Sequence, residues 1–548
     1  MNGTLLLALS SVCLAVAYIF YGRWIAKSWG IDISRKTPAH ELNDGIDYVP
    51  TKRSVVFGHQ FASIAGAGPI NGPIIAAMFG WVPVLLWILL GGIFIGAVQD
   101  FAAMYASVKN KGRSIGYIIE LHIGKTGKKL FLGFVWLFSI LVIAAFADIV
   151  AGTFNGFLSS GDKNSANAAV ATTSILFMVA AVGLGFLIRR TSSNMLETST
   201  AIILLIICIS MGFVIPVFMT QQFWLYSVFI YIFIASVAPV WALLQPRDYL
   251  NAFLLVAMVV CGFVGVIVNN PTMNLVPFAG FEVNGNHLFP ILFVTVACGA
   301  VSGFHALVSS GTASKQIDNE RDILPVSFGS MLIECLLAVL ALIAVGALAV
   351  GGTPPSETPP VVFANAVSGF LTTLGLPQHV VFTLITLSIS AFALTSLDSV
   401  ARVGRLAFQE FFINDESERV SLLMKILTDK YVATTATLTM GYLLALRGYR
   451  DIWALFGSAN QLLAALTLIA CAVFLKKTKR RGFILYIPFA FMLVVTFTAL
   501  GMTILKLISK IPNDFVIASD GLQFILAILL SILGVLVAVQ GVMRLKRE

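Results

Sequence analysis

Six ionisable side chains lie inside long apolar stretches of the chain, where a charge is costly and a functional role is the default expectation. They are His59, Asp100, Asp148, His305, Glu334 and Asp398. A carboxylate or imidazole in such a place can take up a proton or a cation and release it again. Histidine suits the proton because it titrates near neutral pH. These residues therefore indicate binding and release of protons or cations inside an apolar medium.

Three aspartates of this set, Asp100, Asp148 and Asp398, are predicted to be ion-coupling residues, which bind the ion that drives the activity of the protein. Asp148 has no basic residue nearby in the sequence, so a purely structural role is harder to explain. Asp398 is followed by Arg402 and Arg405, at i+4 and i+7 on one helix face, and a structural ion pair there is an equal alternative.

Two apolar segments contain residues that interrupt helices. Residues 66–73 read GAGPINGP, with three glycines and two prolines. Glycine costs about 1 kcal/mol in a helix interior and proline about 3 kcal/mol. The segment 289–313 is also rich in glycine and serine, with His305 at its centre. A helix can be interrupted at membrane depth only where its non-helical backbone is buried in protein or lines a cavity.

This pair of interrupted helices, expected to run in opposite directions, is typical of an inverted-repeat transporter with its binding site at the midplane. We therefore expect backbone groups of 64–72 and 299–310 to form the substrate site, with Asn460 and Gln461 as possible hydrogen-bonding neighbours. The predicted substrate-binding residues are His59, Ser63, Gly66, Gly68, Asn71, Ser302, His305 and Ser309. Free N–H groups at a half-helix N-terminus suit a carboxylate. The alternative is that the glycines only allow close helix packing.

Two of the ionisable residues have simpler interpretations. Glu334 could pair with Arg321 or with a neighbouring helix, and it is not predicted as a site residue. His59 begins the first interrupted helix about two turns before the glycines, so it could face the same cavity. A neutral histidine that donates to a backbone carbonyl is the alternative.

Composition identifies the apolar medium as a lipid bilayer. The 548 residues are 58% hydrophobic and 11% charged, with a mean hydropathy of +0.93, whereas soluble domains carry about 25% charged residues. A bilayer core needs about 20 apolar residues per helix. On that basis the fold class is all-α and polytopic, with about fifteen spans near 4–22, 54–79, 81–108, 130–158, 168–188, 195–219, 222–245, 248–269, 289–313, 325–351, 378–400, 431–447, 452–475, 483–508 and 520–544.

The positions of the basic residues predict the orientation. With the N-terminus outside and the C-terminus inside, all but five of the 35 Lys and Arg residues fall on the inner side, as the positive-inside rule requires. The five exceptions are Lys163, Arg447, Arg450, Lys506 and Lys510. The net charge of +9 comes from Lys and Arg in the short connections between the apolar segments and not from a basic patch, so nucleic-acid binding is excluded.

The sequence indicates no catalytic or metal chemistry. The six cysteines are scattered singly, so neither a zinc site nor a disulfide framework is expected. No HExxH or GxSxG motif is present at membrane depth, and an enzyme is not expected. No polar connection exceeds about thirty residues, so residues 1–548 are predicted to form one transmembrane domain. A membrane-embedded nutrient sensor or channel without active transport is the alternative.

Several long motifs resemble the carbon starvation protein A family. They are RKTPA (35–39), NDGIDYVPT (43–51), FGHQFASIAGAGPI (57–70), GAVQDF (96–101), PRDYL (246–250), the block 297–316, TSLDS (395–399) and LFGSANQLLA (455–464). The resemblance implies a bacterial cytoplasmic-membrane importer of peptides or pyruvate, linked to carbon starvation. It also implies a core related to the amino-acid transporter superfamily, no cofactor, and H⁺ in preference to Na⁺ as the coupling ion.

The chain departs from the family at one position, because relatives commonly have two histidines where it has His59 and Gln60. The family motif also draws attention to Asp44, Asp47 and Tyr48, just before the first interrupted helix. They are predicted to form an inner gate with Lys52 or Arg53. The alternative is that they cap and orient the entry to that helix.

Overall fold

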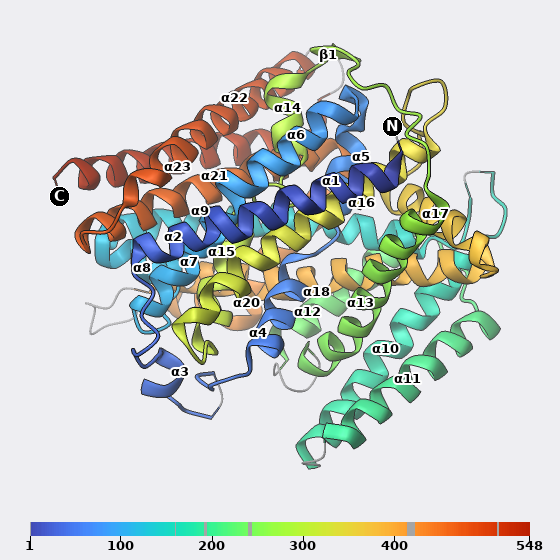
Figure 1. Ribbon diagram of the computed structural model, residues 1–548, viewed down its shortest axis with the longest axis horizontal. Coiled ribbons are helices and arrows are strands. Elements are labelled where there is room, and N and C mark those ends of the chain that lie inside the picture. The colour runs from blue at the N-terminus through green and yellow to red at the C-terminus, as the bar shows by residue number, and fades with distance from the viewer. Residues whose placement is uncertain are drawn as a thin grey trace.

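The computed structural model is almost entirely helical (Figure 1). It describes residues 2–547 except 46, 159, 191–193, 239–243, 414–421 and 512–514. Among these residues the only strands are β1 (Glu282–Val283) and β2 (Asn286–His287), which form an antiparallel hairpin. The helices are α1 (Gly3–Val16), α2 (Arg23–Trp29), α3 (Pro38–Glu41), α4 (Arg53–Ile64), α5 (Gly68–Ala76), α6 (Trp81–Gly91), α7 (Ala97–Lys109), α8 (Ile115–His122), α9 (Lys125–Phe154), α10 (Ser165–Arg190), α11 (Asn194–Val214), α12 (Gln221–Val237), α13 (Leu244–Asn269), α14 (Leu288–Thr295), α15 (Gly303–Gly311), α16 (Ser330–Leu348), α17 (Pro359–Leu371), α18 (Gln378–Phe412), α19 (Leu422–Leu427), α20 (Lys430–Ala445), α21 (Tyr449–Lys477), α22 (Tyr486–Lys510) and α23 (Leu522–Arg547).

Ten helices in the described part of the chain are long and apolar enough to cross a bilayer, and the bent pair α4–α5 makes up to eleven. The expected count of fifteen is not confirmed. The difference arises in five predicted segments whose helices are broken or short. Two are the interrupted segments, and the other three contain Thr198–Val214, Gln221–Val237 and α20, which has 16 residues. These apolar stretches, the first of them the later part of α11, are shorter than the roughly 20 residues that a straight span needs. The inverted-repeat core and the single domain stay predictions.

The centre of the bundle is formed by the helices that are buried on all sides. The apolar window of α21 is 100% buried, and those of α9, α18 and the helix that ends in α16 are also mostly buried. The helix α1–α2 and helices α22 and α23 expose most of their apolar surface. In Figure 1, α22 and α23 lie at the upper left of the bundle, α1–α2 crosses its front, and the hairpin α10–α11 lies at the lower right. This arrangement places α21 where it can hold the interrupted helices.

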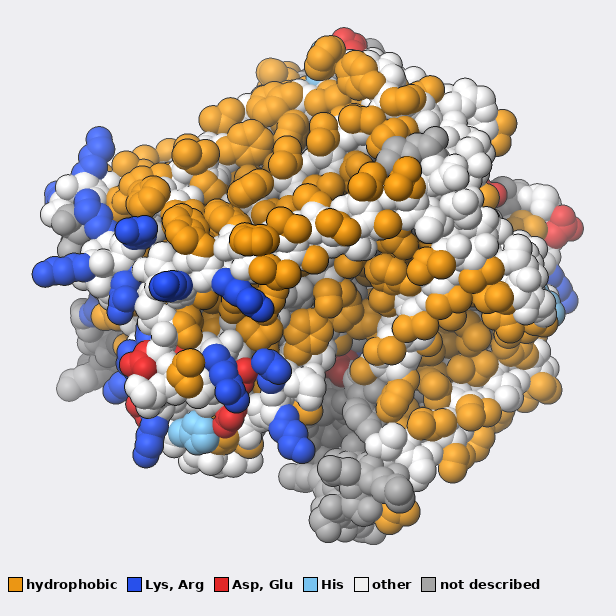
Figure 2. All heavy atoms as spheres, viewed as in Figure 1, with side chains coloured by type: hydrophobic (Ala, Val, Ile, Leu, Met, Phe, Trp, Pro, Cys, Tyr) orange, Lys and Arg blue, Asp and Glu red, His pale blue; other side chains and the backbone are white. Residues whose placement is uncertain are grey.

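Charge and apolar side chains are segregated on the surface. Figure 2 shows a broad hydrophobic face with Lys and Arg gathered at the end of the molecule where α3, α8 and the C-terminus lie. The N-terminus lies toward the opposite end (Figure 1). An apolar belt between polar ends is what a bilayer requires, so the protein is a multi-pass membrane protein.

Small residues let α21 approach the second interrupted helix. A Cβ atom at Gly457 would collide with the carbonyl oxygen of Val294 on α14, and one at Gly303 would collide with the α21 backbone at Asn460. Close backbone contact through glycine is a usual way to pack helices in membranes, where no hydrophobic force acts between them.

We expect Gly457→Ala to lower the unfolding temperature in detergent, because the added methyl group must push α14 away from α21, at a cost of about 1–3 kcal/mol. Gly501→Ala on α22 is the matched control, since no atom lies within 4 Å of its added methyl group. Equal unfolding temperatures for the two variants would contradict this packing.

Candidate functional site

The two interrupted helices meet at their breaks. The first break separates α4 from α5 at residues 65–67, and the second separates α14 from α15 at residues 296–302. A Cβ atom added to Gly72 would lie 2.8 Å from the carbonyl oxygen of Thr295, and one added to Gly299 would lie 3.6 Å from the Cα of Pro69. The glycines predicted to break the helices therefore also allow the two breaks to pack against each other.

Side chains from three neighbouring helices satisfy the carbonyl groups around the second break. Trp87 on α6 donates to Phe293 and Val296 at 3.2 Å each. The other donors are Gln99 to Ser302 at 2.7 Å, Trp453 to Thr295 at 3.1 Å and Gln461 to Phe293 at 2.6 Å. Without such partners, unpaired backbone groups in a bilayer would cost several kcal/mol each.

Asn460 holds the start of α15 from the same side. Its Oδ1 accepts from the backbone N–H of Phe304 at 3.0 Å, and its Nδ2 donates to Ser302 Oγ at 3.1 Å. Asn460 and Gln461 therefore do lie beside the break, as the sequence suggested. The donors Trp87, Trp453 and Gln99 were missed, because nothing in their spacing points to partners 158 to 209 residues away in the chain.

A buried acid–histidine–acid cluster lies directly beyond the second break. His305 Nδ1 lies 3.0 Å from Asp100 Oδ2, and His305 Nε2 lies 3.3 Å from Glu334 Oε2. The three side chains come from α15, α7 and α16, and none is more than 1% exposed. Asp100 and His305 were each predicted as site residues, whereas Glu334 was not. A sequence offers no signal that two acids 234 positions apart share one imidazole.

The Asp100–His305–Glu334 cluster is short of hydrogen-bond partners. The Nε2–Glu334 contact is close but not aligned as a hydrogen bond, and Asp100 Oδ1 and both Glu334 oxygens have no partner among the described residues. With the imidazole protonated and both carboxylates ionised, the cluster carries one net negative charge. One added proton would neutralise it. Because a buried unpaired charge is costly, this arrangement can bind a single proton or cation.

Asn71 on α5 is the second unsatisfied polar group near the breaks. It is fully buried, and neither its amide nitrogen nor its amide oxygen has a partner in the described part of the chain. A buried amide that makes none of its hydrogen bonds is rare in a native fold. Asn71 therefore stays a prediction for a substrate contact, and its free polar atoms favour that role.

Helices α4 and α15 are joined by two side-chain pairs. His59 Nε2 lies 3.2 Å from Thr312 Oγ1 on the exposed side, and Gln60 Nε2 donates to Ser309 Oγ at 2.8 Å on the buried side. Ser63 donates back to the carbonyl of His59 at 2.8 Å. The predicted residues His59, Ser63 and Ser309 thus lie along the α4–α15 contact. Gln60, the departure from the family pattern, touches one of them directly.

Gly66 and Gly68 lie at the first break itself. A Cβ atom at Gly66 would lie 2.8 Å from Ser396 Oγ on α18, and one at Gly68 would lie 2.5 Å from Cys298 Sγ in the second break. At both glycines, an added Cβ atom would therefore lie too close to a neighbouring side chain.

Asp398 belongs to a separate buried ion pair. Its Oδ2 accepts hydrogen bonds from Arg247 Nη1 and from Tyr231 OH, the latter at 2.7 Å. The alternative pairing with Arg402 and Arg405 is wrong, because these arginines donate to backbone carbonyls at the end of α12. The i+4 spacing was misleading, since those carbonyls, left unpaired by the helix end, compete for the guanidinium groups.

Asp148 is a residue of α9, and its side chain lies at the N-terminus of α21. Its Oδ2 accepts from the backbone N–H of Tyr449 at 2.8 Å, and its Oδ1 accepts from Gln221 Nε2 at 2.9 Å. A carboxylate at a helix N-terminus satisfies an orphan N–H and interacts favourably with the helix dipole. These contacts are those of a helix cap, and the coupling role stays a prediction.

Two of the predicted gate residues, Asp47 and Tyr48, contact Lys315. Asp47 Oδ2 lies 3.6 Å from Lys315 Nζ, and the Tyr48 ring centroid lies 5.3 Å from the same atom. Tyr48 OH also donates to the carbonyl of Lys111 at 3.2 Å. Asp44 Oδ1 accepts from the backbone N–H groups of Asp47 and Tyr48, at 2.9 Å each. The loop therefore contacts the segment after α15. Its role as a gate stays a prediction.

Comparison with known proteins gives concordant matches. The family model described as "Carbon starvation protein CstA" matches residues 2–353 and 352–499. A protein of Bacillus subtilis named "Peptide transporter CstA" is 32% identical, over 99% of this chain and 97% of its own length. An Escherichia coli protein named "Pyruvate/proton symporter BtsT" is 32% identical, over 92% of this chain and 82% of its own. A manganese transporter of Eremococcus coleocola is 10% identical, over 90% of this chain and 95% of its own, with a TM-score of 0.48, too low to establish a shared fold.

We expect Asp148→Ala to destabilise the protein by about 0.5–2 kcal/mol, the usual cost of losing a helix cap. The measurement is the unfolding temperature in detergent. Asp451→Ala is the matched control, because Asp451 lies in the first turn of the same helix but is exposed. A stable Asp148→Ala protein that has lost all ion dependence would instead make Asp148 a coupling residue.

Proposed function

The chain belongs to the carbon starvation protein CstA family, and from this premise we propose that it is a secondary active transporter. It imports a small nutrient that carries a carboxylate, either a peptide or pyruvate, across the bacterial cytoplasmic membrane. Transport is by alternating access and is coupled to protons. The observation that carries the proposal is the meeting of two broken helices beside the Asp100–His305–Glu334 cluster.

The breaks supply groups that suit a carboxylate. Helices α5 and α15 both begin at a break, so the positive ends of their dipoles are directed into the interior of the protein. Asn71, on the first turns of α5, offers unpaired donor and acceptor atoms. A peptide C-terminus and pyruvate share the carboxylate that such a site would hold. The names of the two relatives, a peptide transporter and a pyruvate/proton symporter, support these two substrate classes.

The Asp100–His305–Glu334 cluster connects the substrate site to a proton. His305 lies on α15, one half of the second broken helix, while Asp100 and Glu334 lie on the neighbouring helices α7 and α16. A proton bound there removes the net negative charge and changes the attraction between α15 and its neighbours. Movement of α15 at its break would then expose the substrate site to one side of the membrane at a time.

The basic end of the molecule is proposed to face the cytoplasm, with the N-terminus outside. The loop with Asp44, Asp47 and Tyr48 then lies on the cytoplasmic side. Its contacts with Lys315 tie the loop to the chain that leaves α15, so motion of α15 would loosen the loop, as a gate requires.

Uptake into proteoliposomes tests the function. Labelled pyruvate and a labelled dipeptide are compared under an inward proton gradient, an inward sodium gradient and no gradient. We expect accumulation of one solute above equilibrium, abolished by a proton ionophore. Uptake that stops at equal concentrations inside and outside would indicate a channel. No uptake of either solute would contradict the transport proposal and favour a sensor.

Glu334→Gln and His305→Gln should each reduce proton-driven accumulation by about tenfold or more. A tenfold loss corresponds to about 1.4 kcal/mol of free energy. Substrate exchange without a gradient should survive in Glu334→Gln, because only proton release is lost. The matched controls are Glu282→Gln and His287→Gln, an exposed acid–histidine pair 3.6 Å apart in the β1–β2 hairpin. Normal proton-driven uptake by the Glu334 and His305 variants would rule out the cluster as the coupling site.

A further inference from the structure

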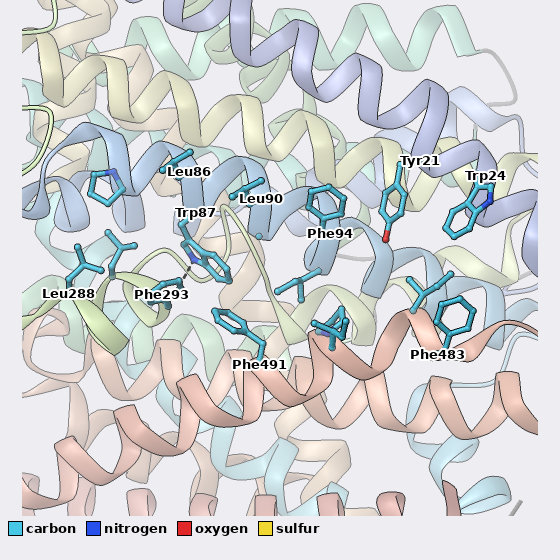
Figure 3. Close-up of a pocket in the computed structure, with 17 residues that line it drawn as sticks. Tyr21, Trp24, Leu86, Trp87, Leu90, Phe94, Leu288, Phe293, Phe483 and Phe491 are labelled. Atoms are coloured by element: carbon cyan, nitrogen blue, oxygen red, sulfur yellow. Dashed lines mark hydrogen bonds between the residues drawn. The ribbon is translucent and has the colours of Figure 1, made fainter. Parts of the chain in front are cut away.

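A long apolar groove lies on the lipid-facing side of the second broken helix (Figure 3). It has a volume of about 780 Å³ and is lined by the end of the first helix, α6, α14 and the start of α22. Tyr21, Trp24, Trp87 and Phe491 are among its lining residues, and nearly all of the lining is apolar. Such a surface in a bilayer is open to acyl chains and offers nothing to a polar ligand.

The groove is long enough for an extended acyl chain. On the helix that begins with α6, the lining residues run from Pro83 to Ile95. Twelve residues at a rise of about 1.5 Å give about 18 Å for this part alone, and half of a bilayer core is about 15 Å. In Figure 3 the groove continues beyond Phe94, from Leu288 at one end to Trp24 and Phe483 at the other.

The end of the groove at Trp24 and Phe483 is basic. Arg23 and Lys27 lie beside Trp24 on the first helix, and Arg480 and Arg481 immediately precede the segment that contains Phe483. All four are exposed, and none has a carboxylate within ion-pair distance among the described residues. The two segments are tied together, since Trp29 Nε1 donates to the carbonyl of Arg481 at 3.1 Å. Four cations thus gather where a lipid headgroup would lie.

We propose that this groove binds one acyl chain of an anionic phospholipid, with the phosphate held by the basic residues at its end. The stacked rings of Tyr21 and Trp24, 5.9 Å apart, lie at the depth where aromatic side chains meet headgroups. A zwitterionic lipid has acyl chains of the same shape but would occupy the groove less, because it lacks the attraction to the four cations. The inference rests on the groove and its charge, and it holds whatever the protein transports.

The bound chain would touch the residue that supports the second break. Trp87 lines the groove through its ring, and its Nε1 donates to Phe293 and Val296 at the break (Figure 3). Its ring packs against Phe293 and Phe491, with centroids 4.8 Å and 5.8 Å away. A chain in the groove would therefore pack against the ring that supports the second break.

Native mass spectrometry of the full-length protein tests the site. The protein is equilibrated in detergent with equal amounts of dioleoyl phosphatidylglycerol and dioleoyl phosphatidylcholine, and retained lipids are counted. We expect preferential retention of phosphatidylglycerol. Arg480→Gln with Arg481→Gln should weaken retention about fivefold for each charge removed, while Lys546→Gln with Arg547→Gln, at the end of α23, should leave it unchanged.

A second variant tests the acyl-chain part of the groove. Leu90→Trp fills it and should reduce retention of both lipids, whereas Leu9→Trp, equally exposed on α1 but outside the groove, should not. Quenching of tryptophan fluorescence by brominated phosphatidylglycerol needs no variant, because Trp24 and Trp87 line the groove. Equal quenching by brominated phosphatidylcholine, or equal retention of the two lipids by the unmodified protein, would overturn the proposal.

Discussion

The structure depends on the hydrogen bonds that the backbone carbonyl groups around the second break accept within the membrane. Residues 293–302 include the end of α14 and the unwound segment, and an unpaired carbonyl there would carry a large cost inside a bilayer. Trp87 and Gln99 donate to Val296 and Ser302 in the unwound segment. Trp453 and Gln461 donate to Thr295 and Phe293 at the end of α14. The positions of α6, α7 and α21 follow from this requirement, and so do the glycines that let α21 approach.

The same unwound segment accounts for the position of the acid–histidine–acid cluster. Helix α15 can restart at Gly303 because Asn460 accepts from its first turn, and this restart directs His305 toward Asp100 and Glu334. A net charge is tolerable there only if it can be neutralised. The break and the cluster are therefore two parts of one arrangement, which links backbone geometry to charge.

Local sequence predicted the breaks but not their partners. The glycines and prolines of 66–73 predict an interrupted helix through intrinsic propensity alone, and α4–α5 is bent by 45° there. His305 and Asp100 were singled out because apolar surroundings make any ionisable residue conspicuous. Glu334 and the Asp398–Arg247 pair could not be assigned, since their partners lie 29 to 151 positions away and are selected by tertiary packing. The count of fifteen spans is not confirmed, because apolar length alone does not distinguish a full crossing from a short or broken helix.

The joint between α4 and α15 contains one hydrogen bond that acid can change and one that it cannot. Gln60 presents a carboxamide to Ser309, and a carboxamide neither gains nor loses a proton at biological pH. His59, one residue earlier, presents an imidazole to Thr312 on the exposed side. With a second histidine in place of Gln60, both halves of the joint would respond to acidity together. In this chain the buried half keeps the same hydrogen-bonding groups at every pH, so a change in acidity can act on the joint only through His59 on its exposed side.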